Sequence, residues 1–201
     1  FKAGGAQAVA AMAYGTESVP KVYKIFGPGN RYVTLAKQLV AGRNTSIDMP
    51  AGPSEVMVMA DGSADAEFVA ADMLSQAEHG RDSQAIVVCD SVVFAQKVAA
   101  AVERQMAELS RADYVAESLK NSRAVVFDSR EQMIAFANEY AAEHLIISME
   151  DAWGVAAEIT AAGSIFIGNY SPESAGDYAS GTNHTLPTSG WAHSCSGVNI
   201  D

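Results

Sequence analysis

The sequence predicts an α/β fold, in which mainly parallel sheets are flanked by helices and form incomplete Rossmann-like units. Short apolar or β-branched runs alternate along the chain with longer segments whose apolar residues recur every three or four positions. Continuous apolar runs are typical of strands buried on both faces, and amphipathic segments between them are typical of helices that cover a parallel sheet. The hydrophobic content of 49% and the charged content of 18% indicate a compact fold rather than a disordered chain.

The elements follow from the periodicity of the apolar residues. Runs with the composition of buried strands lie at residues 22–26, 55–60, 85–89, 124–127, 145–148 and 164–167. Patterns with helical spacing lie at residues 32–40, 64–79, 91–110, 130–140 and 151–161. The pattern at 91–110 is the clearest, because its apolar residues recur at every third or fourth position throughout.

The stretch formed by Asn44-Thr45-Ser46 and Met49-Pro50-Ala51-Gly52-Pro53 is the best candidate for a linker, because proline and glycine interrupt any periodic element there. We expect two units on either side of it. Residues 1–53 would form part of a nucleotide-binding α/β unit. Residues 54–201 would form a second α/β unit, which carries the candidate metal and catalytic residues described below.

Charge and cysteine usage exclude several classes of function. The net charge is −11, with 13 basic and 24 acidic residues, and no basic stripe appears, so nucleic acid is not an expected partner. No apolar run approaches the length of about 18 residues that a membrane helix needs.

The two cysteines have no metal-type spacing, which favours a reduced, cytoplasmic setting. The chain starts without an initiator Met or a signal-peptide pattern, and we expect it to begin inside a longer protein.

The helical pattern at 64–79 carries an unusual polar stripe. Asp72, Ser75, Gln76 and His79 fall on one side of this helix, opposite its apolar residues. Gln76 and His79 are three residues apart, a spacing that lets two side chains bind one ion or ligand. Gly80 is expected to end the helix at the C′ position. From this helix alone, a solvated face with an ordinary terminal histidine is the favoured alternative.

Gly27-Pro28-Gly29-Asn30 follows a predicted strand and precedes a helix. Glycines at such a turn let backbone amides approach a phosphate, and the start of the helix favours negative charge. The third glycine of a dinucleotide motif is absent, so a plain turn is about as well supported as a nucleotide site. Upstream, a second helix of small residues opens near Gln7 and could approach the same ligand.

Two further polar clusters occur downstream. Glu143 and His144 lie between a predicted helix and a strand, where side chains can point into a cleft at the edge of a sheet. They could serve as a water activator and a proton shuttle. An isolated Glu-His pair, however, is more often exposed on the surface without a catalytic role. The Gly/Ser-rich loop at 171–184 contains Asp177, which could complete a metal site begun by Gln76 and His79, although acids in loops are mostly solvated.

Several long motifs of this sequence resemble those of the histidinol dehydrogenase family, in the same order. They are Ile47-Asp48-Met49-Pro50-Ala51-Gly52-Pro53-Ser54-Glu55, Leu74-Ser75-Gln76-Ala77-Glu78-His79-Gly80, Asp82-Ser83-Gln84, Glu143-His144-Leu145 and residues 171–188. The resemblance spans essentially all 201 residues. Family members are considerably longer, so we expect this chain to be the middle and later part of such a protein, without its N-terminal portion and its C-terminal tail.

The resemblance implies a zinc-dependent enzyme that oxidises L-histidinol to L-histidine in two successive NAD steps through a bound aldehyde, the last reaction of histidine biosynthesis. The zinc ligands that it implies are Gln76, His79 and Asp177. The substrate contacts that it implies are Ser54, Gln76, His79, His144 and Asp177. It also implies NAD contacts at Gln7 and Asn30, and an acid–base pair formed by Glu143 and His144.

The resemblance further implies a homodimer, because the family's remaining zinc-ligating His and a substrate-binding Glu come from the C-terminal tail of the other subunit. We therefore expect this chain by itself to lack part of the site. Alternative hypotheses are a paralogous zinc and NAD dehydrogenase for another small polar alcohol, a metal-dependent hydrolase with Glu143 as its base, and a catalytically silent binding domain. No His-Glu-x-x-His motif supports the hydrolase.

Overall fold

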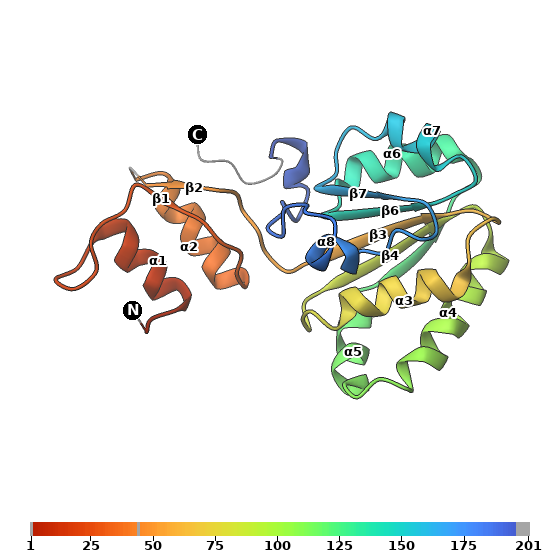
Figure 1. Ribbon diagram of the computed structural model, residues 1–201, viewed down its shortest axis with the longest axis horizontal. Helices are drawn as coiled ribbons and strands as arrows, with labels where there is room; N and C mark the ends of the chain where they lie inside the picture. Colours follow the sequence, from red (N-terminus) through yellow and green to blue (C-terminus); the bar gives the residue numbers. More distant parts are fainter. Residues whose placement is uncertain (1, 44, 196–201) are drawn as a thin grey trace.

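The computed structural model describes residues 2–43 and 45–195, and it confirms the α/β class. Two parallel sheets organise these residues, a small one near the N-terminus and a larger one that follows it (Figure 1). No helix of the described residues is long and apolar enough to cross a membrane.

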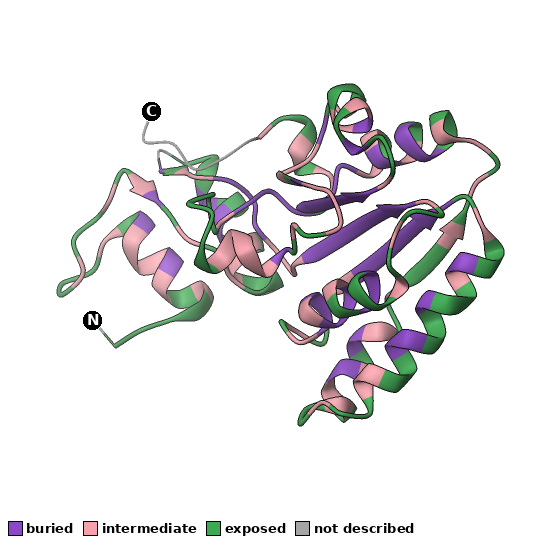
Figure 2. Ribbon diagram, turned by 45° about the vertical axis from the view of Figure 1, so that its right-hand side comes forward, coloured by how far each residue is buried: buried purple, intermediate pink, exposed green. Residues whose placement is uncertain are grey.

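The larger sheet has five parallel strands in the order β5-β4-β3-β6-β7. Its strands are β3 (Glu55–Ala60), β4 (Gln84–Cys89), β5 (Arg123–Val126), β6 (His144–Ser148) and β7 (Ser164–Ile167). Each lies within one residue of a predicted run. Every residue of β3 and β6 is buried, as the unbroken apolar pattern predicts for central strands of a parallel sheet (Figure 2).

Helices cover both faces of this sheet (Figure 1). One face carries α3 (Ala66–Ala77), α4 (Val92–Met106) and α5 (Ala112–Leu119), and the other carries α6 (Arg130–Tyr140) and α7 (Ala152–Glu158). The alternation of side chains along β3 divides the core, because Val56 and Val58 pack with α3 and α4, whereas Met57 and Met59 pack with α6 and α7.

The N-terminal unit is much smaller. Its elements are α1 (Gly5–Tyr14), β1 (Lys24–Ile25), α2 (Arg31–Ala41) and β2 (Ser46–Ile47), and β1 pairs with β2 in parallel. Its buried apolar core consists of Val9, Ala13, Ile25 and Val40. The small sheet ends before residue 53 and the five-stranded sheet begins at Glu55, but the division into two domains at this point stays a prediction.

Several features depart from the expected pattern. The short strand β2 lies in the expected linker region, because two residues are too few to show a period. The predicted loop at 171–184 contains a short helix, α8 (Ser174–Tyr178), and a 3-10 helix (Trp191–His193) follows it. The expected stop at Gly80 is wrong: α3 ends at Ala77, and Glu78 caps it in ordinary helical geometry.

Candidate metal and catalytic site

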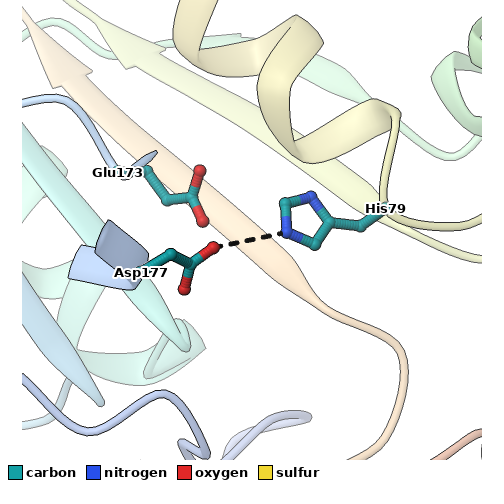
Figure 3. A group of neighbouring side chains, drawn as sticks. All are labelled: His79, Glu173 and Asp177. Atoms are coloured by element: carbon teal, nitrogen blue, oxygen red, sulfur yellow. Dashed lines mark ion pairs between the residues drawn. The ribbon is translucent and has the colours of Figure 1, made fainter. Parts of the chain in front are cut away.

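His79 and Asp177 meet in space although they lie far apart in the sequence. His79 Nε2 lies 3.8 Å from Asp177 Oδ2. Glu173 joins them, and one ligand atom from each of the three residues lies within 4.8 Å of the others. Figure 3 shows the two carboxylates facing the His79 ring. The predicted convergence of His79 and Asp177 is therefore observed, whereas their role as metal ligands stays a prediction.

The segment after β7 brings these acids to α3. It follows α3 along its length, beginning where the rings of Tyr170 and Phe68 lie 5.7 Å apart. About two turns further along α3, Ser75 Oγ donates a hydrogen bond to Glu173 Oε2 at 3.1 Å. The Asp72 carboxylate accepts the backbone N–H of Glu173, and burial raises the pKa of Asp72 to about 6. The chain thus covers Asp72, Ser75 and Gln76 at least in part, so the polar stripe of α3 is not a solvated face throughout, although His79 at its end stays exposed.

Gln76 lies at the centre of this covered stripe with its side chain completely buried. Both its Nε2 and its Oε1 are buried without a hydrogen-bond partner, and so is Glu173 Oε1. Buried polar atoms in folded proteins are nearly always bonded, so buried atoms without a partner indicate a place for a ligand. An amide oxygen, an imidazole and carboxylates form a donor set that suits zinc or another divalent ion.

The imidazole of His79 is oriented for this role. Its Nδ1 lies 3.0 Å from the Ser75 carbonyl oxygen and can donate a proton to it. That tautomer leaves the Nε2 lone pair directed toward Asp177, as metal-binding histidines require. His184 Nδ1 lies 2.8 Å from Asp177 Oδ1 and holds the other carboxylate oxygen.

Glu143 and His144 lie at the start of β6, where both side chains are buried. Ala141 ends α6 in the left-handed region, with φ of 53°, and so turns the chain directly into the strand. Glu143 Oε2 accepts the backbone N–H of Glu55 at 3.0 Å and lies 3.7 Å from His144 Nδ1. His144 Nδ1 lies 3.3 Å from the Glu55 carbonyl oxygen, so it can donate there and keep Nε2 as a proton acceptor.

Burial shifts the pKa values of this pair in opposite directions. It raises the pKa of Glu143 to about 8, because desolvation penalises the carboxylate. It lowers the pKa of His144, because desolvation penalises the imidazolium. The charges of Glu173 and Asp177 partly oppose this lowering of the His144 pKa, and that of His79 adds to it, so His144 lies within electrostatic range of the metal candidates.

Glu55 is a site residue that was not predicted from the sequence. It is buried at the start of β3, accepts the Ser189 N–H at 2.7 Å and the Tyr140 hydroxyl at 3.1 Å, and burial raises its pKa. Glu173 is the other such residue. Two features of the sequence could have identified these residues. Glu55 is a charged residue at the start of an apolar strand, and Glu173 is an acid one helical turn before Asp177.

All these residues gather at the amino ends of the strands. Ligands of open α/β sheets usually bind outside the carboxyl ends. Here α3 runs back from the carboxyl end of β3, so its last turn carries Gln76 and His79 to the amino ends. Glu143 and His144 enter the sheet at the same ends.

A groove of about 530 Å³ connects the N-terminal unit with this site. Its lining includes Asn30 from the glycine turn, Ser54 and His79. Hydrogen bonding from the Ser54 side chain also lowers the pKa of Glu143, against the larger effect of burial. Asn30 caps α2, since its Oδ1 accepts the N–H groups of Tyr32 and Val33. Gln7 is exposed on α1 and is not among the described residues that line the groove.

The histidinol dehydrogenase family matches residues 1–201. A histidinol dehydrogenase of Bacteroides fragilis is 61% identical over 201 residues, which are 100% of this chain and 47% of that protein. That of Salmonella typhimurium is 56% identical over 202 aligned positions, with 100% and 46% coverage. The crystal structure of histidinol dehydrogenase from Elizabethkingia anophelis superposes with a TM-score of 0.92 at 56% identity, covering 100% of this chain and 46% of that one. The chain spans about half the length of these relatives, and it belongs to the histidinol dehydrogenase family.

Proposed function

We propose that this chain carries the metal-binding and acid–base residues, and part of the NAD site, of an enzyme that oxidises L-histidinol to L-histidine through a bound aldehyde. This is the last step of histidine biosynthesis. The observation that carries the proposal is the convergence of His79 and Asp177 beside the buried, unpartnered amide of Gln76, in a chain of this family.

Gln76, His79 and Asp177 would hold a zinc ion. Bound there, zinc would supply a Lewis acid that holds the nitrogen atoms of histidinol, so that the alcohol carbon faces the cofactor. Ser54 and His144 would contact the same substrate. We further propose that the protein acts as a homodimer, in which the other subunit completes the zinc and substrate sites. The free thiols of Cys89 and Cys195 support a reducing, cytoplasmic location.

NAD would supply the hydride acceptor for both oxidations. His144, kept neutral by burial, takes the hydroxyl proton of the substrate as the alcohol becomes the aldehyde. Glu143 takes a proton from water while the water oxygen adds to the aldehyde carbon, and His144 returns its proton to the carbonyl oxygen, which forms the hydrate and leaves His144 neutral again. His144 then takes a hydroxyl proton of the hydrate as it becomes the acid. The raised pKa of about 8 makes the ionised form of Glu143 a strong base, and this form increases as the pH rises toward 8, so Glu143 suits the middle step.

Asn30 and Gln7 would contact NAD. The glycine turn before Asn30 places backbone amides and the positive end of α2 beside the groove, where phosphates of a dinucleotide can bind. Asn30 Oδ1 is occupied by the cap, so the amide nitrogen is the atom that would donate to the cofactor.

Zinc binding and NADH formation test the proposal together. A longer protein that contains this chain and the remaining part of the site should form two NADH per L-histidinol, and a chelator should abolish this. His79→Ala and Asp177→Ala should each weaken zinc binding by at least about 100-fold in chelator competition, whereas His193→Ala, outside the site, should not. Faster turnover of another amino alcohol would favour the paralogue. Product release without NADH would favour the hydrolase.

A further inference from the structure

A buried ion pair lies beneath the glycine turn of the N-terminal unit. Lys37, on α2, donates from Nζ to Asp48 Oδ1, and the side chains are only 2% and 0% exposed. By contrast, the ion pair between Arg104 and Glu67 lies between exposed side chains. A charge pair in the interior of so small a unit therefore needs its own explanation.

The pair binds the backbone of Gly27 from both sides. Lys37 Nζ donates to the Gly27 carbonyl oxygen at 2.6 Å, and the Gly27 N–H donates to Asp48 Oδ2 at 2.7 Å. Asp48 Oδ1 also accepts the N–H of Met49 at 2.6 Å. Gly27 has a φ of 127°, a conformation that residues with a side chain rarely adopt. The ion pair thus holds Gly27 in an unusual backbone conformation.

Gly27 is the first residue of the turn that leads to Asn30. The next residues, Pro28, Gly29 and Asn30, line the groove. Gly29 lies tightly against α2, because a Cβ atom there would be 2.5 Å from a methyl carbon of Val33. The turn is therefore held at its start by the ion pair and at its end by the helix cap.

Stability alone does not require such a pair. Two well-packed apolar side chains of similar volume would join α2 to the chain after β2 about as well, since desolvation of buried charges offsets most of their attraction. An apolar pair could not bind the N–H and the carbonyl group of Gly27. We propose that Lys37 and Asp48 are positioning residues, which fix the Gly27–Asn30 turn so that the backbone amides of the turn and the positive end of α2 face the phosphates of the dinucleotide.

This inference rests on the proposed NAD chemistry, and two variants test it in the zinc-loaded protein. Lys37→Met/Asp48→Asn removes both charges together, so that no unpaired charge remains. Gly27→Ala leaves the pair in place and strains only the turn, because nothing lies within 4 Å of the added Cβ. Each variant should raise the dissociation constant for NADH and the KM for NAD about tenfold or more. The kcat at saturating NAD, the KM for histidinol and the zinc affinity should stay unchanged.

Two matched controls separate positioning from general loosening. Arg104→Met/Glu67→Gln removes an exposed ion pair of the same charges. Gly42→Ala adds a methyl group at another glycine with open space, where φ is an ordinary −76°. Neither control should change NADH binding. Hydrogen exchange at residues 27–33 should accelerate in the double variant and in Gly27→Ala only.

The outcomes are distinct. Unchanged NADH binding in folded Gly27→Ala and folded double variant would overturn the inference. Equal losses of zinc, histidinol and NADH binding would overturn it as well, because they would indicate a merely structural role. If the unchanged protein binds no NADH, the proposed function fails first and the inference fails with it. If the double variant does not fold, Gly27→Ala decides.

Discussion

The two regions of this molecule bury polar side chains in opposite ways. In the N-terminal unit, Lys37 and Asp48 are buried together, and the oxygens of Asp48 accept bonds from Lys37, Gly27 and Met49. Beside the five-stranded sheet, Gln76 and Glu173 are buried just as deeply, but Gln76 has no partner at either polar atom and Glu173 has none at Oε1.

This difference distinguishes buried polar groups that stabilise the fold from buried polar groups that are available to bind a ligand. A buried polar group whose hydrogen bonds are all formed can fix the backbone with little loss of folding free energy. A buried group without partners destabilises the folded chain until a ligand supplies them. The paired region therefore shapes a binding surface, and the unpaired region is where a ligand gains most from binding.

The largest expected effects compare one substitution in each region. Asp48→Ala should lower the free energy of unfolding by about 3–5 kcal/mol, because it leaves the Lys37 ammonium buried and unpaired. Gln76→Leu should raise it by about 1 kcal/mol in metal-free protein, because it removes an unsatisfied amide at similar volume. Urea unfolding with a chelator present measures both. A similar loss in both variants would show that Gln76 is satisfied in solution and would break the comparison.

The buried Glu143 should make stability depend on pH. Its pKa is about 8 in the folded protein and near 4.5 in the unfolded chain. Below pH 4.5 both states are protonated, and as the pH rises to 8 only the unfolded chain loses its proton, so the folded state loses stability. Glu143→Gln should remove this loss and be more stable than the unchanged protein above pH 8, by on the order of 2–4 kcal/mol. The prediction is contradicted if the free energies of unfolding of Glu143→Gln and of the unchanged protein differ by the same amount at pH 5 and at pH 8.5.

Kinetics should separate Glu143 from His144. Glu143→Gln keeps the shape of the side chain but removes the base for water, so the oxidation of aldehyde to acid should slow by on the order of 10²-fold more than the first oxidation. His144→Asn should slow both oxidations, since each needs a proton removed from oxygen. Single-turnover NADH formation from histidinol and from the aldehyde distinguishes them. Equal damage to both steps in Glu143→Gln would refute the division of labour, and zinc binding should persist in both variants.

The smallest expected effect concerns two helix caps. Asn30 caps α2 and Ser91 caps α4, each through its side-chain oxygen. Replacing either by Ala should cost about 1 kcal/mol of stability. Only Asn30→Ala should also weaken NADH binding, because only Asn30 lines the groove. Asn30→Asp keeps the cap and adds a negative charge toward the phosphates, so it should weaken NADH binding while preserving stability.

The strands and most helices follow from the sequence because their signals are local. The strands of the large sheet are continuous apolar runs, and α6 (Arg130–Tyr140) was predicted to the residue. The missed elements, such as β2 and α8, are too short to contain a period and form only because neighbouring chain packs on them. The expected stop at Gly80 failed because Glu78 already caps α3 without a left-handed residue.

The sequence by itself determined the α/β class, the order of the elements and the identity of the polar residues, because periodicity and motifs are properties of neighbouring residues. Only the tertiary structure decided that Gln76 is buried rather than solvated, that Glu173 joins His79 and Asp177, and that the site lies at the amino ends of the strands. It also decided the pKa of Glu143. The desolvation of a side chain and the hydrogen-bond partners of its polar atoms depend on which distant segments cover it, and no local pattern contains that information.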